Sequence, residues 1–198
     1  RMQIKTLIIE EKLLQFIEIE LIAQVENDYR ASSCRILAGH SLGGLFCVYA
    51  YLKSSNLFNG FISMDPALNW DNNVCERTLK SLSGNAPNFN SKLYISSAHN
   101  APENKPDKGP FRMSQVSFTK ELKKKGVDNF KLELFEKEMH LTVPYRSLYE
   151  GLMFIFSDYY IFKNPGFNEE ISFIEEHYNK VSDTYGMKIK PPEYLIEM

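Results

Sequence analysis

The sequence predicts an α/β fold: a doubly wound, mostly parallel sheet with helices on both faces. First, short apolar segments typical of buried strands alternate with helical segments. Second, a Gly-x-Ser-x-Gly motif, Gly39-His40-Ser41-Leu42-Gly43, stands between a strand-like and a helix-like segment. Third, polar loops follow the predicted strands, and a parallel sheet gathers such loops at one edge.

The length suits one domain and the composition a substantial core, since 43% of the 198 residues are hydrophobic and 13% aromatic. The net charge of −2 gives no electrostatic basis for binding nucleic acid or an anionic membrane. No apolar run reaches the length of a membrane span, and no signal-peptide pattern is present. The three cysteines, Cys34, Cys47 and Cys75, lack metal-ligand spacing. We therefore expect no metal, cofactor, nucleic-acid partner or membrane, while compartment and oligomeric state stay open.

The segments before the motif predict a helix and then a strand. Residues 2–9 fit either a strand or the start of a helix. Residues 10–29 carry apolar side chains at three- and four-residue spacing, which predicts a helix. Residues 34–38 are apolar and predict a short buried strand, and residues 45–52, free of Pro and Gly, predict a helix.

The elements after the motif alternate in type. The predicted strands are 60–64, 92–98 and 130–136, of which the last alternates in polarity and fits a place near a sheet edge. The predicted helices are 72–82, 111–125, 145–162 and 169–185. Residues 83–90 are rich in Gly, Pro, Asn and Ser and predict a loop. Gly126 is expected to stop the helix before it.

The Gly-x-Ser-x-Gly motif predicts a nucleophile elbow. A sharp turn from strand to helix would hold Ser41 in a strained conformation with its hydroxyl projecting. We expect Gly39 and Gly43 to flank it because side chains there would collide where strand and helix pass closely. The N–H of Leu42, at the start of the helix, can face a developing oxyanion. The alternative is a Gly-rich turn in which Ser41 is an ordinary helix N-cap.

A serine nucleophile needs a general base, and the chain has four histidines. His140 is the candidate, because it follows the last predicted strand and comes after the serine in the chain. His40 adjoins Ser41 but is expected to point away from it, toward packing or substrate contacts. His99 falls in a polar loop, and His177 falls on the C-terminal helix.

The acid that would orient His140 is expected after the third strand, where Glu103 and Asp107 are candidates, with Glu103 slightly preferred. Asp65 competes because it ends a strand at the same edge, although Asp before Pro is also common in turns. A serine–histidine pair without an acid is a further alternative. Trp70 and Phe111 are candidate walls of a substrate pocket, with Asp65 and His40 as further candidate substrate contacts.

Several segments together resemble the putative esterase family of α/β-hydrolases, which includes esterase D-like and siderophore (enterobactin-type) esterases. The resemblance rests on Leu37-Ala38-Gly39-His40-Ser41-Leu42-Gly43-Gly44-Leu45-Phe46 with the helix before it, and on three further segments. These are Asp65-Pro66-Ala67-Leu68-Asn69-Trp70, His140-x-x-Val143-Pro144 and 147–156, so that about residues 13–160 are covered. Where this chain has Asp65-Pro66-Ala67-Leu68-Asn69-Trp70, the family usually has Ser-Pro-Ser-Leu-Trp-Trp, so Asp65 and Asn69 depart from the family pattern.

The resemblance implies an α/β-hydrolase fold and metal-free hydrolysis of carboxylic esters through an acyl-enzyme. Family members carry several strands before the helix at Glu10, so residues 1–163 are expected to be the C-terminal portion of such a domain. Residues 164–198 are expected to form a helical extension. The ester stays open between a siderophore trilactone, a carbohydrate acyl ester and a small thioester. A non-catalytic protein on the same fold and an acyltransferase using the same residues are the alternatives.

Overall fold

The computed structural model describes residues 3–53, 56–82, 89–102, 105–159, 161 and 171–196. It contains a sheet of four parallel strands in the order β1-β2-β3-β4. The strands are β1 (Ile36–His40), β2 (Gly60–Met64), β3 (Lys92–Ser97) and β4 (Phe130–Leu134). The predicted parallel sheet is therefore confirmed, and β4 lies at an edge as expected.

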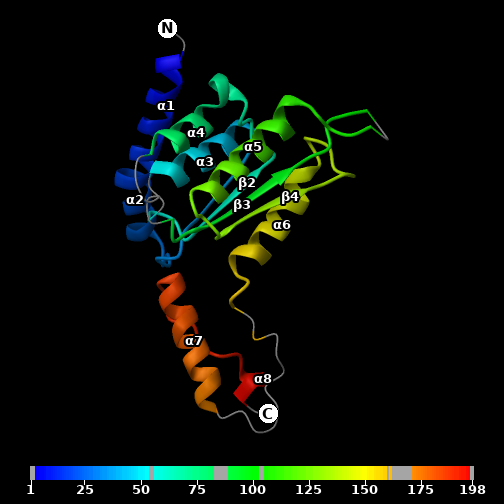
Figure 1. The fold of residues 1–198 in the computed structure, drawn as a ribbon. Coiled ribbons are helices and arrows are strands. Elements are labelled where there is room, and N and C mark those ends of the chain that lie inside the picture. Colours follow the sequence, from blue (N-terminus) through cyan, green and yellow to red (C-terminus); the bar gives the residue numbers. More distant parts are fainter. Residues whose placement is uncertain are drawn as a thin grey trace.

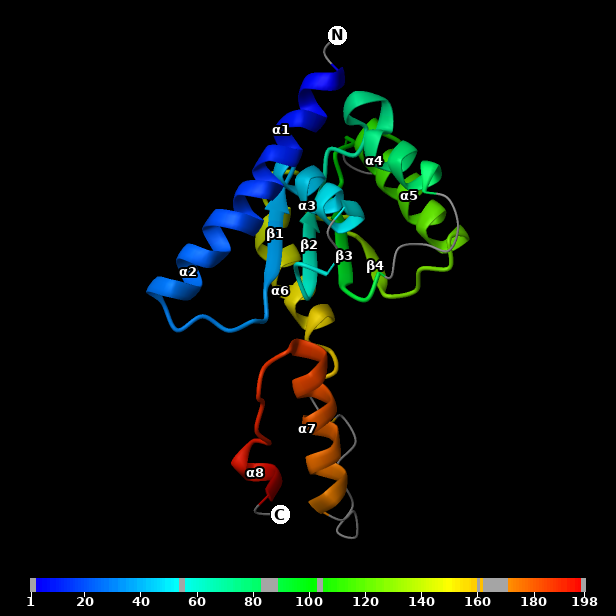
Figure 2. The same ribbon diagram turned by 90° about the vertical axis from the view of Figure 1, so that its left-hand side faces the viewer.

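Helices cover both faces of the sheet (Figures 1 and 2). One face carries the crossover helices α3 (Leu42–Lys53), α4 (Trp70–Ser81) and α5 (Pro110–Lys124). Their apolar side chains form the main core with alternate residues of the inner strands, such as Phe61 and Ile95. The other face carries α6 (Val143–Ile155), which packs on β2 and β3 through Ile62 and Tyr94.

Glycine allows α6 to approach the sheet closely. A Cβ at Gly151 of α6 would lie 2.7 Å from Cγ2 of Ile62, and a Cβ at Gly60 of β2 would lie 2.6 Å from Cδ1 of Ile155. Contacts under 3.0 Å are not tolerated in a packed core, so any side chain at either position would push the helix away from the sheet.

Residues 3–28 are helical throughout, which resolves the alternatives left open for residues 3–9. The helix α1 (Gln3–Phe16) continues through a π-helical turn, η1 (Ile17–Leu21), into α2 (Ile22–Asp28). Leu14 joins the main core beside α3, whereas Phe16 is half-exposed and Ile19 is largely exposed. Within the described residues, no helix is both long enough and apolar enough to cross a membrane.

Two sequence predictions about β1 need correction. The strand begins at Ile36 rather than Cys34, and it is half-exposed rather than buried, with Ala38 exposed. The physical reason is its position: in this structure β1 pairs with β2 on one side only and forms an edge of the sheet. An apolar segment of this kind is typical of an interior strand, so composition alone misjudged its exposure.

Several helix boundaries also differ from prediction. The segment α4 opens with a left-handed turn, because Asp71, Asn72 and Asn73 have φ values of 45°, 50° and 57°. Asp and Asn tolerate this conformation better than most residues. The helix α6 ends at Ile155, before the predicted end at residue 162, and residues 156–159 form turns.

The C-terminal helices α7 (Ile171–Tyr185) and α8 (Glu193–Ile196) lie at the end of the sheet away from its carboxyl edge (Figures 1 and 2). They form a small apolar cluster of their own around Ile174 and Tyr178. The hydroxyl of Tyr185 donates to the carbonyl of Ile155, 2.8 Å away. The expected boundary between residues 163 and 164 lies outside the described residues, as do residues 83–88 of the loop predicted over 83–90.

Candidate active site

The carboxyl ends of the strands bring the candidate residues to one edge of the sheet. Ser41 follows β1 and Asp65 follows β2, each with no residue between. The loop after β3 carries His99, Asn100 and Asp107, and the loop after β4 carries His140. The sequence argument that these residues gather at one edge holds for all of those that the structure describes. Glu103 lies outside the described residues.

The turn at Ser41 has the geometry of a nucleophile elbow. Ser41 adopts a left-handed conformation with φ of 59°, which is unfavourable for a non-glycine residue. Its N–H donates to the carbonyl of Met64 at 3.0 Å, and its carbonyl accepts from the N–H of Leu45 at 3.0 Å. The surrounding backbone thus holds the strained residue between β2 and α3.

The two glycines of the motif play different roles, which corrects one sequence prediction. A Cβ at Gly39 would lie 2.3 Å from the carbonyl oxygen of Gly43, so no side chain fits there. A Cβ at Gly43 would meet no atom within 4 Å, so the predicted collision at Gly43 is wrong. The neighbouring Gly44 is the tighter position, because its Cβ would lie 3.1 Å from Cα of Pro66.

A chain of hydrogen bonds joins a serine, a histidine and a carboxylate. Nε2 of His140 lies 3.1 Å from Oγ of Ser41, and Nδ1 of His140 lies 2.7 Å from Oδ2 of Asp65. A carboxylate only accepts hydrogen bonds, so Nδ1 carries the proton and Nε2 is free to accept from the serine hydroxyl. This is the arrangement in which a histidine can take the proton of a serine nucleophile.

Asp65 is the carboxylate that bonds to His140, although the sequence argument ranked Glu103 and Asp107 above it. Its side chain is completely buried, and its φ of 40° turns the chain sharply after β2. Its N–H donates to both the carbonyl and the hydroxyl oxygen of Ser96, each at 3.1 Å. Its position directly after β2 made it a candidate, but Glu103 and Asp107 also follow a strand, so position in the sequence alone could not rank it first.

Asp107 is engaged elsewhere. Its carboxylate accepts from the N–H groups of Asn100 and Gly109, both at 2.8 Å, and lies 3.7 Å from Nε of Arg112. Burial raises the pKa of this carboxyl, but the two backbone donors and then the Arg112 cation outweigh burial and lower the pKa overall. The contacts of Asp107 therefore organise the loop after β3 and are not directed at His140.

Aromatic rings surround His140. The ring of His40 lies 4.4 Å from it between centroids, and Phe111 meets it edge-on at 5.5 Å and 85°. Burial and then the nearby His140 lower the pKa of His40, although the His140 carbonyl and Asp65 act in the opposite direction. His40 thus packs against the candidate base, in line with the expected packing role, and its contact with a substrate stays a prediction.

The remaining candidates occupy separate positions. Trp70, predicted as a pocket wall, is the first residue of α4 and half-exposed. Leu42 is the first residue of α3, so its N–H is one of the N-terminal amides without a partner inside the helix. Nδ1 of His99 lies 3.0 Å from Glu136, and His177 packs on Tyr178 in α7.

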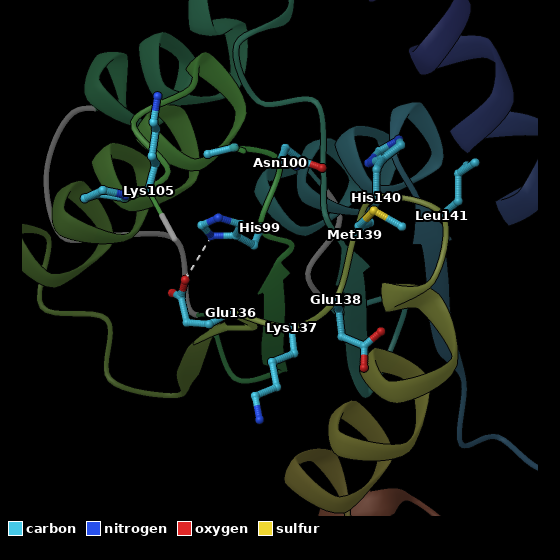
Figure 3. Close-up of a pocket in the computed structure, with 11 residues that line it drawn as sticks. His99, Asn100, Lys105, Glu136, Lys137, Glu138, Met139, His140 and Leu141 are labelled. Atoms are coloured by element: carbon cyan, nitrogen blue, oxygen red, sulfur yellow. Dashed lines mark hydrogen bonds and ion pairs between the residues drawn. The ribbon is translucent and has the colours of Figure 1, made fainter. Parts of the chain in front are cut away.

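An open cavity of about 1170 Å³ begins at His140 and extends between the loops after β3 and β4. Figure 3 shows His99 with its bond to Glu136 in the middle of this region, while Lys105 and Lys137 extend in opposite directions. A smaller cavity of about 290 Å³ lies beside it, lined by Asn100, Phe111 and His140 among others. In the described part of the chain, no group of three or more His, Cys, Asp or Glu is arranged to hold a metal ion.

Comparisons with known proteins agree with this architecture. The model of the family described as "Putative esterase" matches residues 8–112, more than half of the chain. Ferri-bacillibactin esterase BesA of Bacillus subtilis (strain 168) is 36% identical over 62 residues, which are 31% of this chain and 22% of that protein.

Two solved structures share the fold. An IroE-like serine hydrolase from Shewanella oneidensis superimposes with a TM-score of 0.70 at 23% identity, covering 93% of this chain and 58% of that one. The enterobactin esterase FES from Shigella flexneri superimposes with a TM-score of 0.62 at 16% identity, covering 74% and 38%. The chain therefore spans less than two thirds of these relatives, and its sheet corresponds to part of an α/β-hydrolase fold. From the family match and the shared fold together, we conclude that the chain belongs to the putative esterase family.

Proposed function

We propose that this chain carries the catalytic residues of a serine hydrolase that cleaves carboxylic esters through an acyl-enzyme. The observation that carries the proposal is the pair of hydrogen bonds that joins Ser41, His140 and Asp65 at 3.1 and 2.7 Å. Membership of an esterase family supports the same reaction class.

In the first half-reaction, Oγ of Ser41 attacks the ester carbonyl while its proton moves to Nε2 of His140. Asp65 accepts from Nδ1 and stabilises the imidazolium that forms. The N–H of Leu42 donates to the oxyanion of the tetrahedral intermediate, with the positive end of α3 behind it. Collapse of the intermediate breaks the ester C–O bond, and the departing alcohol takes the proton from His140.

In the second half-reaction, water replaces the alcohol. His140 takes a proton from the water as its oxygen attacks the acyl carbon, and collapse of the second intermediate returns that proton to Oγ of Ser41. The products are a carboxylic acid and the free serine. Phe111 beside His140 and the half-exposed Trp70 are the proposed walls for the acyl group.

For the substrate, we propose a siderophore ester. Two relatives are named for such substrates, a ferri-bacillibactin esterase and an enterobactin esterase. The cavity of about 1170 Å³ beside His140 supports a bulky substrate, because clefts for drug-sized ligands measure about 300–1,000 Å³.

Covalent labelling of the 198-residue chain with a fluorophosphonate tests the reaction class. We expect one adduct on Ser41, found by mass spectrometry, and none in Ser41→Ala. Ser32→Ala, an exposed serine after α2, is the matched control and should label like the wild type. Labelling that persists in Ser41→Ala, or a wild type that takes up no label, would contradict the proposal. Hydrolysis of a catecholate trilactone, compared with p-nitrophenyl acetate, tests the substrate.

A further inference from the structure

The carboxylate of Asp65 is held by four donors. Oδ1 accepts from the N–H of Ala98 at 3.1 Å and from Nε2 of Gln115 at 2.9 Å. Oδ2 accepts from Nδ1 of His140 at 2.7 Å and from Nδ2 of Asn100 at 3.2 Å. Because the side chain has no exposed surface, these bonds replace the hydration that an ionised carboxylate has in water.

Gln115 is the donor that holds Asp65 from helix α5. It lies on α5 with no exposed surface, and its amino group donates both to Asp65 and to the carbonyl of Pro66, 3.0 Å away. Two acceptors on the same atom identify that atom as the nitrogen. The bonds join α5 to the sharp turn that carries Asp65, so they set both the position and the direction of the carboxylate.

The oxygen of the Gln115 amide lowers the stability of the fold. Its Oε1 is buried and has no hydrogen-bond partner among the described residues. Burying an unsatisfied polar atom opposes folding, and an apolar side chain of similar size would pack on α5 without that cost. Packing alone therefore does not account for a glutamine at this position, whereas the two bonds of its amino group do.

The charge of the donors also matters. The four donors to Asp65 are a backbone amide, two side-chain amides and His140, whereas Asp107 lies 3.7 Å from the Arg112 cation. A cation beside Asp65 would offset its negative charge and weaken its attraction for an imidazolium. Neutral amides stabilise the ionised form by hydrogen bonding while they leave the charge available to His140.

We propose that Gln115 is a positioning residue of the active site, which holds the buried Asp65 carboxylate directed at His140. The inference rests on the proposed function, since it assigns Asp65 the role of the acid. Gln115 acts through Asp65 and does not touch the substrate.

The test is Gln115→Met, which keeps the length of the side chain and removes both hydrogen bonds. We expect kcat for a p-nitrophenyl ester to fall about 10- to 100-fold with KM unchanged, because a hydrogen bond to a charged group is lost at the acid only. Thr119→Val is the matched control: among the residues that the structure describes, this buried hydroxyl, one turn later on α5, bonds only to the helix carbonyls of Gln115 and Val116. We expect it to leave kcat unchanged.

A double-mutant cycle separates positioning from a general effect on folding. In an Asp65→Asn background, Gln115→Met should cost less than threefold, because its target has already been altered. An equal loss in both backgrounds, or a kcat in Gln115→Met equal to that of the wild type, would overturn the inference. Gln115→Asn, whose shorter side chain cannot reach both acceptors, provides a second variant if Gln115→Met does not fold.

The turnover of the wild type distinguishes a failure of the positioning role from a failure of the proposed function. If wild-type turnover depends on Ser41 and the Gln115 variants match it, only the positioning role fails. If wild-type turnover is absent or independent of Ser41, the proposed function fails and the positioning role fails with it.

Discussion

Replacing Asp65 by Asn gives the sharpest test of the candidate site, because the two side chains have the same shape. Both oxygens of Asp65 accept two hydrogen bonds each. Asn has one oxygen and one amino group. In either orientation the amino group would face two donors, on one side Ala98 and Gln115, on the other Asn100 and His140.

The two orientations damage the site differently. If the Asn amino group faces His140, the ring can accept at Nδ1 only by moving its proton to Nε2, and Nε2 can then no longer accept from Ser41. If the Asn oxygen faces His140, the hydrogen bond survives but the charge that stabilises the imidazolium is lost. Replacing the Asp of a serine–histidine–aspartate triad by Asn costs about 10⁴-fold in kcat, which is about 5 kcal/mol of transition-state stabilisation.

The assay is kcat/KM for a p-nitrophenyl ester, with the melting temperature measured in parallel. Asp107→Asn is the matched control, since Asp107 is also a buried carboxylate in a loop at the same edge. We expect it to lower the melting temperature while kcat/KM stays within about tenfold of the wild type, because its bonds hold the loop and not the base. Glu103→Gln completes the set and should also leave kcat/KM within about tenfold of the wild type.

The result that would refute the reasoning is a larger loss in Asp107→Asn or Glu103→Gln than in Asp65→Asn. That result would move the acid to the loop after β3. A loss below tenfold in all three variants would favour a serine–histidine pair without an acid.

Two further predictions concern stability. Burial lowers the pKa of His40 below its ordinary value of 6.5, so the unfolded chain binds more protons and the folded state loses stability as pH falls below about 6.5. In urea unfolding between pH 5 and 7.5, the free energy of unfolding of His40→Phe should fall less steeply with falling pH than that of the wild type. Equal slopes of this free energy against pH would contradict the prediction. Gly151→Ala should cost about 1–3 kcal/mol, because the added methyl would lie 2.7 Å from Ile62, while Gly43→Ala, with open space around its Cβ, should stabilise α3 by about 0.5–1 kcal/mol. Melting temperatures that fall equally would contradict the steric argument.

Local pattern was sufficient to locate the serine and the histidine. The Gly-x-Ser-x-Gly turn needs only a strand before it and a helix after it, and both are visible within a few residues of Ser41. His140 could be selected because it follows the last strand, and the carboxyl ends of parallel strands meet at one edge whatever the loops do. The same reasoning predicted the four strands and their parallel arrangement.

Local pattern did not locate the carboxylate that bonds to His140. Asp65, Glu103 and Asp107 all follow strands, so sequence order could not rank them; which carboxylate reaches Nδ1 of His140 depends on how two loops and α5 pack together. The exposure of β1, the open space at Gly43 and the buried amide of Gln115 also depend on neighbours that are distant in the chain. The sequence by itself determined the order of strands and helices and the place of Ser41 and His140, because those follow from local spacing. Only the tertiary structure decided the partner of His140, because hydrogen bonding is decided over a few tenths of an ångström between residues that the fold brings together.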